Sequence, residues 1–389
     1  MKNVALLGGT GSIGDATVKI LSLYKDCFRL KAVTTNSNIK KLFSIIELLN
    51  PEYAVVTDQD FFYKEFNSYQ IQYKGIQIYS GIDGLQQIYN DNSIDIVVNG
   101  ISGKAGLKPS FDILSSGKDL AIANKESIVC AGKILRNKAI ETGAKIIPVD
   151  SEHSAVFSLL NRSKSVEKII LTASGGPFLR LDKSNWNTIT VSDALDHPTW
   201  KMGNKISIDS ATMANKGLEV IEAHELFGFD YDKIKVMIHP QSLIHSMIET
   251  SDGELYAQIG PNDMSIPVQN ALSFPEIIYN NYNRFDFTGS YNFELIPVDF
   301  NKFKMLEYAY LCGKKGGFFP PFYNFVNEIL VNYFLNGSIS FIEIESIMEK
   351  SIEMFNNNKE WTFLTPDLEN LSVLDDYALN VVNKLIGDA

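Results

Sequence analysis

The feature that most constrains this chain is a short apolar strand that runs directly into a glycine-rich turn. Residues 3–7 read Asn-Val-Ala-Leu-Leu, the turn at 8–14 reads Gly-Gly-Thr-Gly-Ser-Ile-Gly, and a helical pattern begins at Asp15. In such a unit, backbone amides and the helix N-terminus face a pyrophosphate, and glycine lets the pyrophosphate approach closely. An ordinary tight turn is the alternative that this context disfavours, so the sequence predicts a dinucleotide site.

The segment from residue 3 to about 150 repeats this alternation of short apolar runs with amphipathic helical patterns. The alternation is typical of a parallel sheet that helices cover on both faces. We therefore expect an α/β protein whose N-terminal part, residues 1–149, is a doubly wound Rossmann-like domain. Its strands are expected at 4–7, 30–34, 53–56, 76–79, 94–98, 120–123 and 145–149.

After residue 150 the regular alternation stops. Apolar runs at 167–172, 235–242, 243–249 and 255–259 predict a mixed sheet, and with it a central α+β catalytic domain over 150–273. An irregular, aromatic stretch predicts a linker over 274–300. Apolar residues spaced by three and four then predict a small C-terminal helical bundle over 301–389. Its helices are expected at 305–311, 323–335, 341–354 and 374–386.

Composition argues against several partners and compartments. An apolar share of 45% in 389 residues is ordinary for a soluble globular protein, and a net charge of −11 argues against a nucleic-acid surface. Cys27, Cys130 and Cys312 show no paired spacing, which fits a reducing compartment. Neither a cleavable leader nor an apolar run of about 18 residues is visible. We therefore expect a cytoplasmic protein that binds neither nucleic acid nor membrane.

The residues after the second expected strand bear on the choice of cofactor. An acidic residue there would bind a free ribose 2′-hydroxyl and repel a 2′-phosphate. The chain instead has Asn36, Ser37 and Asn38, followed by Lys40 and Lys41. Donors in place of a carboxylate favour NADPH. The alternative is that these polar residues only form a loop and cap the next helix.

Two further polar segments follow strands at the carboxyl edge of the expected sheet, where ligands of open α/β sheets bind. The first is Asn-Gly-Ile-Ser-Gly at 99–103, and the second is Ala-Asn-Lys-Glu-Ser at 123–127. Asn124, Lys125 and Glu126 are therefore candidates for contacts with the nicotinamide side of the cofactor and with the substrate.

A divalent metal site is indicated by carboxylates at the end of the first domain and beyond it. Asp150 and Glu152 stand two apart in a segment expected to be extended, so they would point to the same side and could bind one hard cation. A third ligand is expected from Glu219. Asn215 and Glu219 are four apart, so they share one face of a helix.

A phosphate site is indicated by a glycine-containing loop and a helix. The loop at 173–178 reads Ala-Ser-Gly-Gly-Pro-Phe, and its hydroxyl and approachable amides can cradle phosphate, although taken alone it could be a plain turn. Ser210 is expected to cap the N-terminus of the helix that carries Asn215 and Lys216, where anions are stabilised. Ser174, Ser210, Asn215 and Lys216 are thus expected to form one phosphate pocket.

The loop at 196–204 has the composition of a lid. Trp200 lies between Pro198 and Gly203, so the loop can move at its ends while the indole shields a reacting centre from water. Alternatively, Trp200 only anchors a long loop in the core. His239 and His245 are expected to be structural.

Taken together, these stretches resemble the 1-deoxy-D-xylulose 5-phosphate reductoisomerase family. The resemblance rests on Gly-Gly-Thr-Gly-Ser-Ile-Gly at 8–14, Ala-Asn-Lys-Glu-Ser at 123–127, Pro-Val-Asp-Ser-Glu-His at 148–153, Ser-Gly-Gly-Pro-Phe at 174–178, His-Pro-Thr-Trp-Lys-Met-Gly at 197–203 and Lys-Ile-Ser-Ile-Asp-Ser-Ala-Thr-Met-Ala-Asn-Lys-Gly-Leu-Glu at 205–219. These motifs run in order over the first 220 residues, and the helical tail also looks like the family's C-terminal domain.

The resemblance implies a role for each matching residue. The metal ligands for Mg²⁺ or Mn²⁺ would be Asp150, Glu152 and Glu219, which with Lys125 form the catalytic set. The substrate contacts would be Lys125, Ser151, Glu152, Ser174, His197, Ser210, Asn215, Lys216 and Glu219. The cofactor contacts would be Thr10, Gly11, Ser12, Ile13, Asn36, Ser37, Asn38, Asn124, Glu126 and Gly203, with Trp200 and Met202 in the lid.

One departure from the family pattern concerns the cofactor. Some members place Gly-Lys at the positions of Asn36 and Ser37, so that cationic contact is missing here. The resemblance implies NADPH all the same, with its strictness over NADH left open.

The implied activity is NADPH- and metal-dependent conversion of 1-deoxy-D-xylulose 5-phosphate to 2-C-methyl-D-erythritol 4-phosphate in non-mevalonate isoprenoid biosynthesis, by retro-aldol and aldol isomerisation and then hydride reduction. A homodimer is a further expectation from the family. Two alternatives remain. A semialdehyde-type NADPH-dependent dehydrogenase would need a nucleophilic cysteine, for which Cys130 is the candidate. A non-enzymatic NADPH-sensing module would have no need of three carboxylates.

Overall fold

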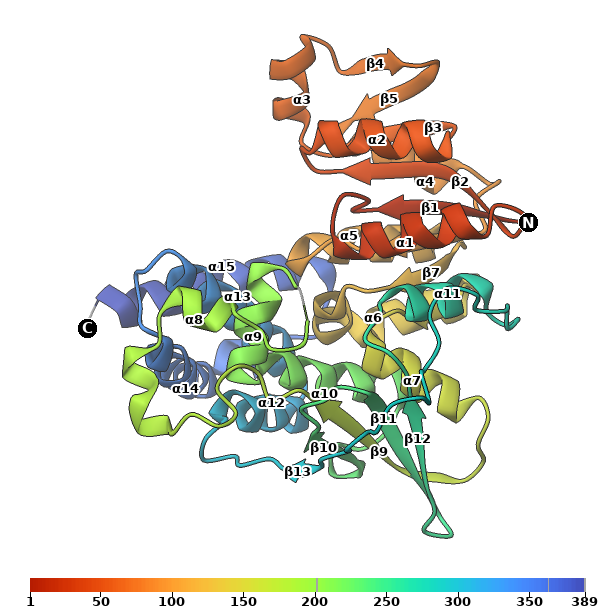
Figure 1. The fold of residues 1–389 in the computed structure, drawn as a ribbon. Coiled ribbons are helices and arrows are strands. Elements are labelled where there is room, and N and C mark those ends of the chain that lie inside the picture. The colour runs from red at the N-terminus through yellow and green to blue at the C-terminus, as the bar shows by residue number, and fades with distance from the viewer. Residues whose placement is uncertain (201, 363, 388–389) are drawn as a thin grey trace. The chain divides into compact units, whose positions relative to one another are not determined.

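The computed structural model describes residues 1–200, 202–362 and 364–387 (Figure 1). Its contacts divide the chain into two compact units. Unit 1 comprises Met1–Asn124, Leu135–Ser154 and Asp263–Tyr282, and unit 2 comprises Lys125–Ile134, Ala155–Asn262 and Asn283–Ala389. Helices α6 (Lys125–Thr142) and α7 (Ser151–Leu160) each contribute residues to both units. The domain boundaries expected from the sequence remain a prediction.

Unit 1 is built on an eight-stranded sheet in the order β4-β5-β3-β2-β1-β6-β7-β8, in which β4 pairs antiparallel to β5 and the other pairs are parallel. The expected Rossmann-like sheet is confirmed, and β4 is an addition to it. Residues Val4, Ala5, Leu6 and Leu7 of β1 are fully buried, as a parallel strand covered on both faces must be. The strands are β1 (Lys2–Leu7), β2 (Phe28–Thr35), β3 (Tyr53–Val56), β4 (Gln70–Tyr73), β5 (Ile76–Ser80), β6 (Ile96–Asn99), β7 (Asp119–Ile122) and β8 (Ile146–Pro148).

The strand order of unit 1 reverses at β1, because β2 and β3 lie on one side of it and β6, β7 and β8 on the other. Such a reversal point is where open α/β sheets bind their ligands, at the carboxyl ends of the strands. The glycine-rich turn follows β1 at that point. The helices of unit 1 are α1 (Ser12–Leu23), α2 (Ile39–Leu49), α3 (Gln59–Phe66), α4 (Gly81–Asn90), η1 (Gly103–Gly106), α5 (Leu107–Ser115) and α11 (Ser265–Ser273).

Helix α11 is not among the elements expected from the sequence. It belongs to unit 1, where Lys19 of α1 forms a 2.9 Å ion pair with Asp263, just before α11. Lys2 also donates to the Leu272 carbonyl at 3.1 Å. Tertiary contacts with α1 and β1 therefore stabilise a helix whose own hydrophobic pattern is weak.

Unit 2 contains a mixed five-stranded sheet in the order β12-β11-β9-β10-β13. Strand β9 pairs parallel to β10 and antiparallel to β11, and the pairs β11–β12 and β10–β13 are antiparallel. This confirms the expected central α+β architecture. The strands are β9 (Val166–Ala173), β10 (Ile234–Ile238), β11 (Ile244–Thr250), β12 (Leu255–Ile259) and β13 (Ile296–Pro297).

The helices of unit 2 include the expected C-terminal bundle, in which Phe322 and Phe355 stack with ring centroids 4.1 Å apart. In the described part of the chain, no helix combines the length and the apolar character needed to cross a bilayer. The helices are η2 (Lys183–Thr188), α8 (Val191–Leu195), α9 (Asn204–Thr212), α10 (Ala214–Phe227), η3 (Tyr231–Lys233), α12 (Lys304–Lys315), α13 (Phe319–Leu335), α14 (Phe341–Asn357), η4 (Lys359–Thr362) and α15 (Leu368–Gly387).

Candidate functional site

The glycine-rich turn of unit 1 is packed so closely that Gly8 and Gly14 leave no room for a side chain. A Cβ at Gly14 would lie 2.1 Å from the Gly9 carbonyl oxygen, and a Cβ at Gly8, where φ is +73°, would lie 2.8 Å from the Gly100 carbonyl oxygen. Gly11 is the N-cap of α1, so no side chain of the cap covers the first amides of the helix, at Ser12 and Ile13. These amides can therefore bind an anion.

Threonine hydroxyls fix this turn to the end of β2. The Thr10 and Thr35 hydroxyls are 2.8 Å apart, the Gly8 amide donates to the Thr34 hydroxyl at 3.0 Å, and the Gly9 amide donates to the Thr34 carbonyl at 2.7 Å. The expected pyrophosphate loop and the expected 2′-phosphate loop are thus held side by side.

The polar residues after β2 have structural partners of their own. The Asn38 side chain caps α2 by accepting from the Lys41 amide at 3.1 Å, and Asn36 accepts from the Thr57 hydroxyl at 3.1 Å. The capping alternative is therefore confirmed for Asn38. The contacts of Asn36, Ser37 and Asn38 with a cofactor remain a prediction.

Asn124 holds the loop that follows β6. Its amide nitrogen donates to the carbonyls of Ile101 at 2.6 Å and Gly103 at 2.7 Å, and the side chain is almost fully buried. A Cβ at Gly106 would lie 2.6 Å from the Asn124 carboxamide carbon. Asn124 therefore positions the carboxyl edge of the sheet, whatever it contacts in a bound cofactor.

In unit 2, Glu219 of α10 is a buried carboxylate surrounded by donors. The Lys125 ammonium donates to Glu219 Oε1 at 3.1 Å, and the Asn215 amide donates to the same atom at 2.5 Å. Lys216 donates to Glu219 Oε2, and Lys125 also donates to Asn215 Oδ1 at 2.9 Å. The prediction that Asn215 and Glu219 share one helix face is confirmed. Lys125, from the start of α6, joins them.

The segment with Asp150 and Glu152 is not extended, which corrects the sequence prediction. Strand β8 ends at Pro148 and helix α7 begins at Ser151, so Glu152 lies in a first helical turn. Strand alternation therefore does not align the two carboxylates. Ser151 donates to Glu152 Oε2 at 2.5 Å.

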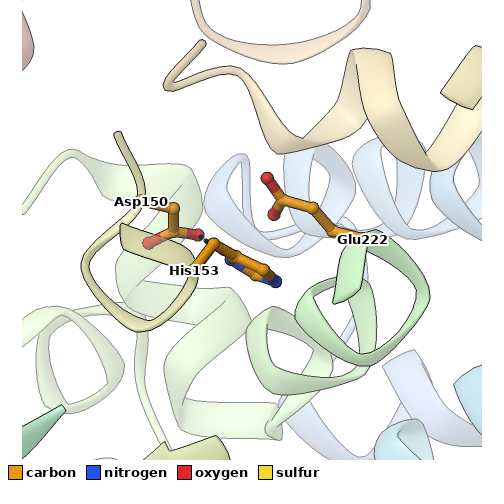
Figure 2. A group of neighbouring side chains, drawn as sticks. All are labelled: Asp150, His153 and Glu222. Carbon is orange, nitrogen blue, oxygen red and sulfur yellow. Dashed lines mark ion pairs between the residues drawn. The ribbon is translucent and has the colours of Figure 1, made fainter. Parts of the chain in front are cut away.

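Asp150 precedes α7 and pairs with a histidine one turn further along. Figure 2 shows its carboxylate directed toward the buried His153 ring, with His153 Nδ1 at 3.7 Å. The figure also draws Glu222, a buried carboxylate of α10. Asp150 and Glu152 belong to unit 1 and Glu219 to unit 2, so their joint binding of one ion remains a prediction.

Ser174, His197 and Ser210 form a second cluster in unit 2. His197 Nε2 lies 3.0 Å from the Ser174 hydroxyl and 3.1 Å from the Ser210 hydroxyl. His197 Nδ1 accepts from the backbone amides of Thr199 at 3.2 Å and Trp200 at 3.0 Å. Burial lowers the pKa of His197, so the ring is neutral at pH 7 and its proton is on Nε2.

Ser210 is not the helix cap that the sequence suggested. It lies in the last turn of α9, and Met213, with φ +63°, separates α9 from α10. The glycine loop approaches α9 so closely that a Cβ at Gly176 would lie 2.7 Å from the Ser210 carbonyl oxygen. This approach, and not a capping position, brings Ser174 and Ser210 to the same histidine.

A buried charge cluster beside these residues was missed by the sequence analysis. The Lys205 ammonium donates to Glu126 Oε1 at 2.9 Å and to Asp209 Oδ2 at 2.8 Å, and Asn327 of α13 donates to Asp209 Oδ1 at 2.7 Å. Burial alone would lower the pKa of Lys205, but the neighbouring Asp209 and Glu126 carboxylates outweigh burial and raise it. Burial alone would raise the pKa of Glu126, but the Lys205 ammonium outweighs burial and lowers it. The cluster therefore joins α6, α9 and α13.

The expected lid at 196–204 includes Lys201, which lies outside the described residues. Its beginning is tied to His197 through the Thr199 and Trp200 amides. Gly203 is the N-cap of α9 and has open space around it. Closure of this loop, with Trp200 and Met202 over a substrate, remains a prediction. His239 is fully buried, and its Nδ1 lies 2.9 Å from the Glu294 carbonyl, as fits a structural residue.

Three family models match the chain: "1-deoxy-D-xylulose 5-phosphate reductoisomerase" over residues 4–132, its C-terminal domain over 146–227, and "DXP reductoisomerase C-terminal domain" over 259–380. The 1-deoxy-D-xylulose 5-phosphate reductoisomerase of Clostridium novyi is 43% identical over 359 residues, which cover 92% of this chain and 93% of the relative. The chain belongs to the 1-deoxy-D-xylulose 5-phosphate reductoisomerase family.

Solved structures of reductoisomerases agree with this assignment. The enzyme from Zymomonas mobilis in complex with NADPH is 36% identical with a TM-score of 0.87, over 99% of each chain. A DOX-P reductoisomerase in complex with NADPH, fosmidomycin and magnesium is 33% identical with a TM-score of 0.89, over 100% of this chain and 98% of the other. The reductoisomerase fold thus extends over the whole chain.

Proposed function

We propose that this protein is an NADPH- and divalent-metal-dependent reductoisomerase that converts 1-deoxy-D-xylulose 5-phosphate to 2-C-methyl-D-erythritol 4-phosphate in non-mevalonate isoprenoid biosynthesis. The single observation that carries the proposal is the 43% identity to a reductoisomerase over nearly the full length of both chains. The arrangement of Lys125, Asn215 and Glu219 in unit 2 supports it, because it provides a buried carboxylate and a cation together.

Unit 1 holds NADPH in this proposal. The first amides of α1 and the turn residues Thr10 and Gly11 would bind the pyrophosphate, since no capping side chain covers these amides. Asn36, Ser37 and Asn38 would lie at the 2′-phosphate. Asn124 of unit 1, with Glu126 and Gly203 of unit 2, would complete the site.

Asp150, Glu152 and Glu219 would hold Mg²⁺ or Mn²⁺. The donor set fits such an ion, because hard cations are bound through carboxylate oxygens and all three residues supply them. When bound, the ion would stabilise negative charge that develops on substrate oxygens. Lys125, whose ammonium reaches Glu219, would add a second positive charge and can donate a proton to a substrate oxygen.

The substrate phosphate would be bound by donors from four segments of unit 2. His197 offers the Nε2 proton, Ser174 and Ser210 offer hydroxyls, and Asn215 and Lys216 offer an amide and an ammonium. Because these groups lie on two loops and two helices that hydrogen bonds and packing hold together, they can fix the pose of the reacting carbons. Binding energy at the phosphate would then serve orientation.

A semialdehyde-type dehydrogenase is disfavoured by the state of its candidate nucleophile. Cys130 is buried, its sulfur accepts from the Asn324 amide at 3.3 Å, and burial raises the pKa of the thiol well above its usual range. Such a thiol stays protonated and unreactive at neutral pH. A non-enzymatic NADPH-sensing module would gain nothing from the Glu219 arrangement.

NADPH oxidation with 1-deoxy-D-xylulose 5-phosphate tests the proposal. Turnover is expected with Mg²⁺ or Mn²⁺ and should disappear with a chelator and return when metal is added. Turnover that continues in the chelator would refute the metal assignment. NADPH binding without turnover under all metal conditions would favour the sensing module.

We also propose a cytoplasmic homodimer. Within the described residues, β12 is an edge strand whose Leu255, Tyr256 and Ile259 are 63%, 44% and 44% exposed. An apolar edge of this kind pairs readily with another chain. Light scattering after size exclusion should give a dimer, and Ile259→Lys should shift it toward monomer. A wild-type monomer at micromolar concentration would contradict this part.

A further inference from the structure

The corner between the glycine-rich turn and α2 contains a lysine with an unusual set of partners. The Lys41 ammonium donates to the Thr10 carbonyl at 3.0 Å and to Asp15 Oδ2 at 2.7 Å. Thr10 is the residue whose hydroxyl meets Thr35 at the end of β2. The ammonium therefore lies where the loops after β1 and β2 come together, all within unit 1.

The backbone places Lys41 in this corner by a specific cap. Asn38 accepts from the Lys41 amide at 3.1 Å, and the Asn38 amide donates to the Thr35 hydroxyl at 3.3 Å. These bonds fix the first turn of α2 to the end of β2, and the Lys41 side chain reaches the glycine-rich turn. Lys40 is exposed, and no hydrogen bond of its side chain is found among the described residues.

We propose that Lys41 supplies the cation that binds the 2′-phosphate of NADPH in this chain. The inference rests on the proposed cofactor site. Residues 34–38 contain no acidic side chain that would repel the phosphate. The Lys41 side chain remains 34% exposed, so an incoming phosphate can reach it.

The present partners of Lys41 are compatible with this role. An ammonium has three donors, so a third can be offered to an anion while the Thr10 contact is kept. The Asp15 carboxylate is 62% exposed, and an ion pair of that kind is weak and screened by salt. A 2′-phosphate, with more than one negative charge, can displace Asp15. NADH lacks this phosphate and would gain nothing.

The test compares binding of NADPH and NADH by titration calorimetry in wild type, Lys41→Gln and Lys40→Gln. Lys40→Gln removes the same charge from the neighbouring position and is the matched control. Glutamine at 41 can still donate to the Thr10 carbonyl, so the turn stays fixed. A hydrogen bond to a charged group contributes about 1.4 kcal/mol or more, which is about tenfold in affinity.

We expect Lys41→Gln to weaken NADPH about tenfold, to change NADH less than about twofold, and to reduce the salt dependence of NADPH binding. Lys40→Gln should leave both affinities near wild type, and Lys41→Arg should retain the preference for NADPH. Each variant is checked by its melting temperature.

Two results would overturn the role of Lys41. Equal losses for NADPH and NADH would mean that it only supports the turn, and equal losses in Lys40→Gln would mean that general charge is responsible. A wild-type protein that binds both cofactors equally would instead refute the proposed NADPH preference itself, so the two failures are distinguishable.

Discussion

The cofactor corner of unit 1 and the charge clusters of unit 2 hold their functional groups in different ways. In unit 1, the glycine turn, Thr10, Thr34 and Thr35 are joined by neutral hydrogen bonds, and the Lys41–Asp15 ion pair beside them is largely exposed. In unit 2, Glu219 and Lys205 are charged centres with oppositely charged partners. The folded state should therefore lose little stability when one polar side chain of the unit 1 corner is replaced. Removing one charge from a unit 2 cluster instead leaves its partners as buried, uncompensated charges.

The largest effect is expected for Glu219→Gln. Lys125 and Lys216 lose their shared carboxylate, so turnover should fall to background and the free energy of unfolding should drop by about 3 kcal/mol. NADPH binding should remain, since unit 1 is unchanged. NADPH oxidation, calorimetry and urea unfolding measure the three quantities. The control is Glu369→Gln, at an exposed position of α15, and substantial turnover in Glu219→Gln would contradict the proposed metal set.

The next largest effect is expected for Lys205→Met, which leaves the Glu126 and Asp209 carboxylates without their shared ammonium partner. We expect a loss of about 3 kcal/mol in unfolding free energy. Lys233→Met breaks the exposed pair with Glu167 and should cost less than about 1 kcal/mol. Similar losses in the two variants would show that the buried cluster has no special weight.

The same cluster predicts a pH dependence. Because the folded-state pKa of Glu126 is lowered from its ordinary 4.5, its contribution is fully present above pH 4.5 and is lost as the pH falls toward the folded value. The raised pKa of Lys205 keeps its own contribution intact at neutral and acidic pH. The stability difference between wild type and Lys205→Met should therefore shrink in acid. A difference that stays constant down to pH 3 would exclude Glu126 as the titrating partner.

An intermediate effect is expected for Gly176→Ala, which combines a positive φ of +66° with a close approach to the Ser210 carbonyl. Gly228→Ala, also at positive φ but with open space, isolates the backbone contribution of about 1 kcal/mol. We expect Gly176→Ala to raise KM for the sugar phosphate severalfold with NADPH affinity unchanged. Equal kinetics in the two variants would mean that the approach of the loop to α9 is not needed.

The smallest effect is expected for Asn38→Ala, which removes the cap of α2 in unit 1. Loss of a cap costs about 1 kcal/mol, and the melting temperature should fall by a few degrees. Turnover at saturating NADPH should change little. A collapse of activity in this variant would make the cofactor corner as sensitive as the buried clusters and remove the contrast between the two units.

The sequence could predict those parts of the site that depend on local spacing. The glycine turn after β1 and the shared face of Asn215 and Glu219 follow from short periodicities, and both are confirmed. The errors concern element boundaries. Strand β8 ends at Pro148 and α7 begins at Ser151, so Glu152 is helical. Met213 separates α9 from α10, so Ser210 lies inside α9 and does not cap α10.

The features that sequence reasoning missed depend on long-range packing. Asp209 and Asn327 are 118 residues apart, and no periodicity links them. Lys205 and Asp209 are four apart on α9, a spacing that signals an ion pair but usually an exposed one. Packing of other helices against α9, including α13 with Asn327, accounts for the burial of Asp209.

The hydrogen bond from the Asn327 amide to Asp209 limits how the protein can be truncated or recombined with relatives. The C-terminal helices are not an appendage that can be cut away to leave a minimal enzyme, since trimming them would strip a donor from the helix that presents Ser210. Chimeras that exchange the C-terminal helices between relatives should be active only when the residues at positions 209 and 327 can still form this hydrogen bond.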